Sequence, residues 1–415
     1  MSRVIALCFL LLTAVLGFLH IDSRPAWAPF ATQIVTPVEE ELEVAPAPKP
    51  KNQNTPSKAN IASPVSTWLP ETGAASVHAA SLIALKDGAL RAFWFAGSRE
   101  GAADVVINSA VFDPKSSNWS APTVVMDRVS AEKGLSRYIS KLGNPVPARM
   151  ADGRLQLFFV TVSIGGWAGS SISSVISDDE GLTWSNPQRL IGSPLINIST
   201  LVKSPAIAFA DGRLGLPAYH EWIGRFGEFL RVDAGQVIDK RRMSSGRSAI
   251  QPLVFVNDAQ DATAYFRQTR RAGYAKQVPV SETFNAGQSW QSVADLPIAN
   301  PNSAVAGLIL NSGARILVLN NIEAGRYRLA LMMADPKSGQ WQVIEVVEDD
   351  EALPADQRKE FSYPYLISTD GNDAHLAYTW DRKKIRHRYF SGAWLKRAQS
   401  QLDTPSANII SQEAK

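Results

Sequence analysis

Short apolar runs separated by turn residues occupy the chain from about residue 70 to residue 395. Runs such as SLIAL at 81–85 and ILVLN at 316–320 are strand-like in composition, and no sustained helical period links them. Tight-turn residues separate pairs of runs at Asp87-Gly88, Asp152-Gly153, Asp211-Gly212, Asn257 to Asp261, Asn311-Ser312-Gly313 and Asp370-Gly371. Because such residues favour hairpin turns, each position predicts two antiparallel strands.

A second repeated marker runs in step with these turns. Related segments end at intervals of 65, 54, 52, 51 and 53 residues, at Trp119, Trp184, Ile238, Trp290, Trp341 and Trp394. Six units of about 53 residues with four strands each predict an all-β fold, a six-bladed β-propeller with four-stranded blades. We expect residues 66–71 to pair with the last blade and close the ring.

The N-terminal region differs from the rest of the chain. Arg3 precedes an apolar run over residues 4–19, and Ala26-Trp27-Ala28 has the small residues that signal peptidase requires, although Pro29 hinders cleavage. Residues 1–28 are therefore predicted to be a signal peptide or a single-pass membrane anchor, with the protein exported to the periplasm or held in the inner membrane facing it. We predict a disordered linker over 29–65, the propeller over 66–398 and a flexible tail over 399–415.

Composition narrows the chemistry that the propeller can perform. The chain is 45% hydrophobic and 20% charged with a net charge of +3, so no strong field favours nucleic acid. Cys8 is the only cysteine, which excludes a disulfide or a CxxC metal site in the folded part. The five histidines lack HExxH spacing, so the sequence does not favour a zinc site. We expect neither a metal nor another cofactor, and the composition does not indicate an oligomeric state.

Strand alternation locates the candidate chemistry. If the predicted hairpin turns lie on one face of the disc, the other face carries the residues around the start of strand one and after strand two of each blade. Those near strand one include His78, Asn144, Lys203, Gln251, Asn302, Glu360 and Tyr363. Those near or after the end of strand two include Arg99, Glu100, Asp104, His220, Glu221, Arg267, Tyr378 and Arg382. This gathering of polar groups predicts a binding site.

One repeat carries a recognisable motif. The pattern Ser177-x-Asp179-x-Gly181-x-Thr183-Trp184 matches the Asp-box, or bacterial neuraminidase repeat, and residues 70–395 resemble the sialidase-like six-bladed propellers, most closely their predicted-neuraminidase branch. The box itself is expected to be structural, because its Asp and Gly suit a tight turn and its Trp suits packing between strands.

The resemblance implies a catalytic arrangement. Sialidases hold a carboxylated sugar with an arginine triad, use an Asp as acid and use a Tyr assisted by a Glu at the reacting carbon. Here Tyr363-Pro364-Tyr365-Leu366 resembles the nucleophile segment, and Arg267 is similar to the second triad arginine. Two positions depart from the pattern: His78 stands in place of the first arginine, and Gln251, which cannot take a proton, stands in place of the Glu.

Three functional hypotheses follow. The leading one is an exported sialidase-like exo-glycosidase for an acidic or polar glycan, in which Tyr363 with Glu360 is the nucleophile or stabiliser and Glu100 or Glu221 is the acid or base. The second is a uronate lyase that uses His78 or His220, and the third is a non-catalytic propeller that binds glycan or protein. The residues expected to bind substrate are His78, Arg99, Asp104, Asn144, Lys203, His220, Gln251, Arg267, Asn302, Tyr378 and Arg382.

Overall fold

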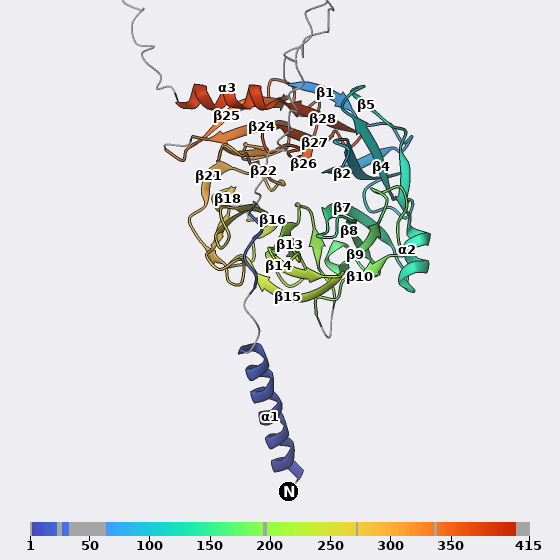
Figure 1. Cartoon of the computed structure of the whole chain (residues 1–415), viewed down its shortest axis with the longest axis vertical. Helices are drawn as coiled ribbons and strands as arrows, with labels where there is room; N and C mark the ends of the chain where they lie inside the picture. Colours follow the sequence, from blue (N-terminus) through green and yellow to red (C-terminus); the bar gives the residue numbers. More distant parts are fainter. Residues whose placement is uncertain are drawn as a thin grey trace, which may run out of the picture.

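Six antiparallel sheets stand around a central axis and form a ring (Figure 1). The computed structural model describes residues 2–22, 27–32, 64–193, 197–270, 273–335 and 338–403. The predicted six-bladed β-propeller with four-stranded blades is confirmed. First strands of neighbouring blades pack on one another, so these strands are the innermost.

The first three blades follow one another along the chain. Blade one contains β2 (Ser76–Ala84), β3 (Leu90–Gly97), β4 (Val106–Asp113) and β5 (Asn118–Trp119), with β6 (Thr123–Met126) also paired to β4. Blade two contains β7 (Lys141–Arg149), β8 (Leu155–Val162), β9 (Ser170–Ser177) and β10 (Gln188–Arg189). Blade three contains β11 (Leu201–Val202) and β12 (Ile207–Ala208) as an interrupted first strand, then β13 (Leu214–His220), β14 (Phe226–Asp233) and β15 (Gln236–Arg242).

The remaining blades repeat the same order. Blade four contains β16 (Ala249–Val256), β17 (Ala262–Gln268), β19 (Val280–Thr283) and β20 (Gln291–Ser292), and β18 (Gln277–Val278) pairs separately with β21 (Leu296–Ala299). Blade five contains β22 (Ala306–Ile309), β23 (Arg315–Leu319), β24 (Arg328–Ala334) and β25 (Trp341–Asp349). Blade six contains β26 (Phe361–Ile367), β27 (Ala374–Trp380), β28 (Lys384–Phe390) and β1 (Val65–Trp68).

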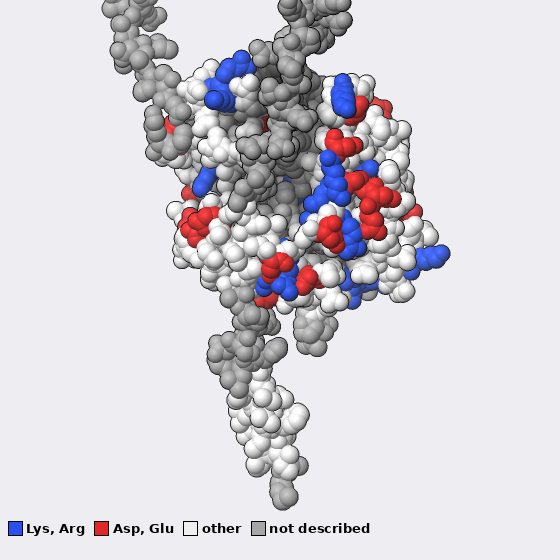
Figure 2. Space-filling view, in the orientation of Figure 1, with Lys and Arg blue, Asp and Glu red and all other residues white. Residues whose placement is uncertain are grey.

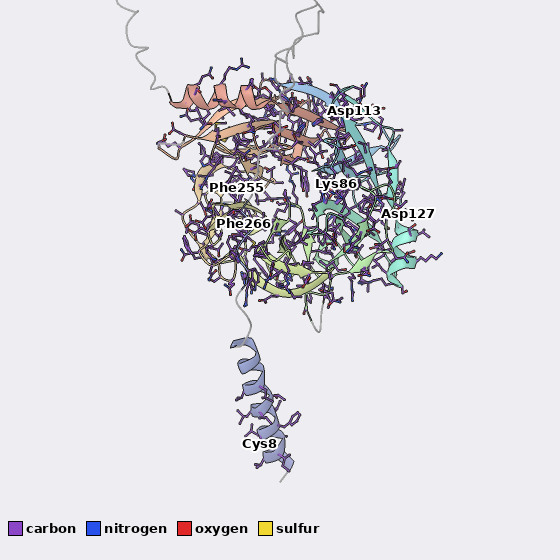
Figure 3. All side chains as sticks on the ribbon, in the orientation of Figure 1. Cys8, Lys86, Asp113, Asp127, Phe255 and Phe266 are labelled. Atoms are coloured by element: carbon purple, nitrogen blue, oxygen red, sulfur yellow. The ribbon has the colours of Figure 1, made fainter. Side chains whose placement is uncertain are left out.

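The core fills the spaces between blades. Phe255 and Phe266 lie on adjacent strands of blade four and belong to two different apolar clusters, one on each side of the blade (Figure 3). Alternation along a strand sends successive side chains to opposite faces of its sheet. Because each blade packs between two neighbouring blades, both faces of its sheet are buried. Between blades one and two lies the helix α2 (Arg128–Leu135), which was not predicted. Asp127 caps its N-terminus, where the carboxylate accepts a hydrogen bond from the Ser130 N–H (2.8 Å).

The ring closes as expected, through the pairing of β1 with β28. Trp394, which was counted as the end of a sixth repeat, instead lies in the helix α3 (Gly392–Asp403), so the fourth strand of blade six comes from β1. Leu395, Ala398 and Leu402 recur at helical spacing, and Leu395 and Leu402 pack on the cluster between blades five and six. The flexible tail predicted from residue 399 therefore starts too early, and residues 404–415 lie outside the described residues.

The N-terminal region contains the helix α1 (Ser2–Asp22). None of the helices in the described part of the chain is long and apolar enough to cross a membrane.

Residues 27–32 contact the propeller, although residues 29–65 were predicted to be a linker. Phe30 and Trp27 are buried between blades three and four, where Phe30 forms an antiparallel bridge with Phe209. The indole N–H of Trp27 donates to an Asp239 carboxylate oxygen (2.9 Å). The two rings supply apolar area that sequence patterning gave no reason to place there, because they precede the first strand by more than thirty residues. The rest of the predicted linker, 33–63, lies outside the described residues.

The Asp-box of blade two has the structural role expected for it. Asp179 accepts hydrogen bonds from the Thr183 N–H (2.9 Å) and hydroxyl (2.6 Å), and Gly181 has a φ of +90° that other residues resist. The Trp184 ring lies 5.8 Å from the Phe93 ring of blade one. The box thus fixes the turn between strands three and four and joins its blade to the preceding one.

Candidate functional site

The inner strands bend at equivalent places. Non-glycine residues with positive φ occur at Ala79, Asn144, Gln251, Asn302 and Tyr363, and the register shifts beside four of these positions, in β2, β7, β16 and β26. A bulge re-aims the side chains of a strand, and backbone strain on the order of 1 kcal/mol at each such residue must be offset by its surroundings. These bends lie on the face opposite the hairpin turns. We call this the site face, and the other the turn face.

Two phenols and two amides meet on the site face. The Tyr363 hydroxyl accepts a hydrogen bond from the Gln251 side-chain amide (3.4 Å). The same amide donates to the Tyr219 hydroxyl (3.2 Å), which also accepts from the Asn144 amide (3.4 Å). The His78 ring lies 4.3 Å from the Tyr363 ring. The structure thus brings together four sequence-predicted residues from blades one, two, four and six.

Arginine side chains lie beside this group. The Arg267 guanidinium donates to the Asn302 amide oxygen (2.7 Å) and the Gln251 amide oxygen (3.4 Å). Arg326 donates to the Asn302 carbonyl (3.0 Å) and pairs with Glu360 (3.0 Å). Sequence reasoning missed Arg326 and Tyr219. Arg326 lies within the loop after β23 rather than directly at the strand end, and Tyr219 lies inside β13, one residue before the predicted His220.

The three predicted catalytic carboxylates have different environments. Burial opposes ionisation of Glu360, but the hydrogen bond from Arg382 and the charge of Arg326 outweigh it and lower its pKa to about 2. Glu100 pairs with Arg382 (2.6 Å). Burial raises the pKa of Glu221, against the opposing charges of Arg267 and Arg225. Glu221 is therefore better suited than Glu360 to hold a transferable proton near neutral pH.

Lys203 connects blade three to blade six. It lies where the first strand of blade three is interrupted, and its ammonium group donates to the Pro364 carbonyl of blade six and sits over the Tyr365 ring at 5.3 Å. Burial lowers the pKa of Lys203 to about 7. Its contact with the residue after Tyr363 makes it a positioning residue for that segment.

His78 is a weak base in this fold. It is 1% exposed, and neither ring nitrogen has a hydrogen-bond partner among the described residues. Burial, together with the charge of Arg382, lowers the pKa of His78 to about 3. A group with so low a pKa is a poor proton acceptor near pH 7, which weakens the case for proton abstraction by His78 in a lyase.

Several predicted site residues serve other purposes. Tyr378 is buried between blades five and six, where its hydroxyl donates to Glu348 (2.6 Å), because β27 has no bulge to turn this position towards the axis. Asp104 accepts hydrogen bonds from the Ser98 N–H and hydroxyl (2.9 Å each), which hold the loop that carries the exposed Arg99. His220 stacks on Phe226 at 4.8 Å and accepts the Ile223 N–H (3.3 Å).

The described residues contain no group of three His, Cys, Asp or Glu side chains placed to hold a metal ion.

Comparison with known proteins identifies the family. The profile of the BNR repeat-like domain matches residues 88–376. The chain belongs to this family. A search of curated proteins finds no sequence match. The predicted sialidase-like, BNR-repeat relationship is thus confirmed, and the match extends from the turn after β2 into β27.

Solved structures share the fold of this BNR repeat-like domain. A Dyadobacter fermentans protein described as of unknown function superposes with a TM-score of 0.62 at 11% identity, over 79% of this chain and 97% of that one. The NanB sialidase of Streptococcus pneumoniae gives 0.59 at 12% identity, over 78% and 69%. The intramolecular trans-sialidase of Ruminococcus gnavus gives 0.58 at 14% identity, over 77% and 95%. At these identities the likeness shows the common six-bladed fold.

Proposed function

We propose that this protein is a glycoside hydrolase that acts on an anionic sugar on the site face. The observation that carries the proposal is the placement of a carboxyl group with a raised pKa, Glu221, and the phenol of Tyr363 around the buried Tyr219. Both groups raise the pKa of Tyr219 electrostatically, in addition to the larger effect of burial, so both lie near it.

Arg267 is the anchor proposed for the sugar's carboxylate. Arg326 and Arg382 are occupied by Glu360, and Arg382 also by Glu100. Arg267 instead makes its hydrogen bonds to the neutral amides Asn302 and Gln251. Its planar guanidinium therefore keeps the charge and the paired donors that match a carboxylate.

The proposed reaction assigns Glu221 as the proton donor. As the glycosidic C–O bond breaks, the Glu221 carboxyl protonates the leaving oxygen, and the Tyr363 hydroxyl oxygen stabilises the oxocarbenium-like carbon. Water then adds to that carbon and returns a proton to Glu221, so one water is consumed for each bond broken. Gln251 donates to the Tyr363 oxygen but cannot remove its proton, which favours the role of stabiliser over that of covalent nucleophile.

The test uses the purified full chain and methylumbelliferyl glycosides of N-acetylneuraminic acid and of uronic acids. Glu221→Gln is expected to lower kcat by roughly 100-fold or more, because it removes a proton-transfer group while keeping the shape of the side chain. Glu323→Gln, at an exposed position in the loop after β23, is the matched control and should keep full turnover. Full turnover of Glu221→Gln would reject the assignment, and sugar binding without turnover in the wild type would favour a non-catalytic propeller.

A further inference from the structure

An indole joins neighbouring blades at four junctions on or near the turn face. Trp184 packs against Phe93 (5.8 Å between ring centroids) and Trp290 against Phe229 (5.6 Å). The other two pairs are Trp341 with Tyr265 at 6.2 Å and Trp119 with His387 at 5.4 Å. In each case the Trp follows the turn between strands three and four, and its partner belongs to the preceding blade. A flat ring is therefore the regular filler of this space.

Blade three departs from this rule. After Asp233 and Gly235, the position that holds Trp184 in blade two is Ile238, whose exposed fraction is 44%. In blade three, β15 pairs with β14 from its first residue, Gln236, so the loop that carries the indole in blade two is missing.

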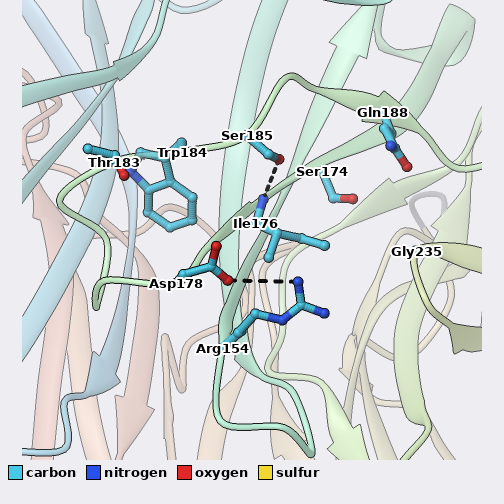
Figure 4. A pocket seen from close by; sticks show the side chains of 9 residues that line it. All are labelled: Arg154, Ser174, Ile176, Asp178, Thr183, Trp184, Ser185, Gln188 and Gly235. Atoms are coloured by element: carbon cyan, nitrogen blue, oxygen red, sulfur yellow. Dashed lines mark hydrogen bonds and ion pairs between the residues drawn. The ribbon is translucent and has the colours of Figure 1, made fainter.

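A cavity of about 320 Å³ lies between blades two and three, where the corresponding ring of blade three would stand (Figure 4). It is lined by Arg154, Ser174, Ile176, Asp178, Thr183, Trp184, Ser185, Gln188 and Gly235. All of these except Gly235 come from blade two, the neighbour against which an indole of blade three would pack.

The lining is polar and has no net charge. Arg154 pairs with Asp178 across it at 3.8 Å and more closely with Asp152 at 2.8 Å, so the guanidinium charge is offset (Figure 4). The Gln188 amide makes no hydrogen bond within the described part of the chain and lies exposed at the cavity. At one wall the Ser174 hydroxyl already accepts from Gln156 (3.0 Å), while Ile176 and Trp184 supply apolar surface.

We propose that this cavity is a second carbohydrate site, which binds one neutral pyranose ring. Its volume is at the lower end of ligand pockets, which start near about 300 Å³, and suits a single ring rather than an oligosaccharide. A ring of hydroxyl groups can use the amide, guanidinium and carboxylate together, and its less polar face can rest on the apolar side chains. The offset charges disfavour an acidic sugar, in contrast to the guanidinium cluster on the site face. The proposal does not depend on any catalytic activity.

The experiment measures binding of methyl glycosides of glucose, galactose and N-acetylglucosamine to the full chain, by saturation-transfer NMR and calorimetric titration, with methyl glucuronide as the charged comparison. At least one neutral glycoside should bind without competition from the glucuronide. Gln188→Ala should weaken that binding by about 10-fold, and Gln188→Trp should abolish it by filling the cavity. Gln188 is exposed, and melting temperatures check that the two variants fold.

The matched control is Gln291→Ala. Gln291 is the exposed first residue of β20, the fourth strand of blade four, as Gln188 is of β10, and there the next blade supplies its indole, because Trp341 of blade five packs on Tyr265 of blade four. This variant should bind as the wild type does. The proposal is overturned if no neutral glycoside binds, if Gln188→Trp binds unchanged, or if the signal disappears in Arg267→Lys instead, since that result would place the sugar on the site face.

Discussion

The two faces of the disc use charge in different ways. On the turn face, ion pairs such as Lys86–Glu180 (3.5 Å) and Arg213–Asp233 (2.8 Å) join blades or neighbouring strands, and Figure 2 shows basic and acidic side chains intermixed over blades one to three. On the site face, Arg326 and Arg382 pair with Glu360, whereas Lys203 and His78 are buried without a carboxylate partner and Arg267 is bonded to amides. The same repeat thus stabilises the disc at one end of its strands and carries polar groups without a carboxylate partner at the other.

The largest expected effect tests the turn face. Trp290→Ala should lower the free energy of unfolding by about 3 kcal/mol, because it removes a ring that packs between blades three and four and leaves a cavity. Urea denaturation measures this loss, and binding of an anionic sugar on the site face should not change. Trp222→Ala, at an exposed position, is the control and should cost little stability. Equal losses in the two variants would contradict the structural role of the indole.

A smaller effect is expected on the site face. Arg267→Lys keeps the charge but loses the planar pair of donors, so binding of N-acetylneuraminic or glucuronic acid should weaken by about 2 kcal/mol with little change in melting temperature. Calorimetric titration and thermal unfolding measure the two quantities. A large fall in melting temperature with unchanged affinity would show that Arg267 stabilises the fold, as the ion-paired residues of the turn face do, and does not bind the sugar.

The smallest effect concerns pH. Glu360 has a pKa of about 2 in the folded protein, below its ordinary value of 4.5, so folding favours its ionised form. Its contribution of roughly 1–2 kcal/mol, allowing for partial solvent exposure, is present above about pH 4.5 and is lost as pH falls towards 2. Glu360→Gln should flatten this part of the stability curve, as measured by denaturation at several pH values.

The matched turn-face variant sharpens the pH comparison. Glu180 also has a lowered pKa, caused chiefly by its hydrogen bond from Arg149. Glu180→Gln should therefore alter acid stability in the same direction, but only Glu360→Gln should also change the affinity for an anionic sugar. A change in affinity from both variants would show that the two faces are not functionally separate.

Sequence periodicity predicted the blades but only part of the site. Turn residues and the spacing of the Trp markers are local signals, so they gave the six sheets, and strand ends gave Gln251, Arg267 and Tyr363. The bulges decide which side chain faces the axis, because a shift of one residue sends a strand position to the opposite face. Tyr378, on the unbulged β27, was placed wrongly for this reason.

Other features had no local signal at all. Arg326 lies in a loop, where the hydrophobic pattern carries no information on direction. Trp27 and Phe30 reach a groove formed by residues about 180–260 positions later in the chain, such as Phe209 and Gly287. Contacts at this separation depend on the assembled ring rather than on the pattern of any one segment.

The closing pair of strands sets a constraint on folding during synthesis. Ser66 of β1 bonds to Arg386 of β28, which is 320 residues later. At about 5–20 residues per second, a ribosome completes β28 roughly 15–65 s after β1 has been made. Blades one to five can collect their own strands in order during that interval, whereas β1 must keep an unpaired edge until the end. The slow step of folding is therefore expected to be the capture of β1 by blade six, the contact with the highest sequence separation in the ring.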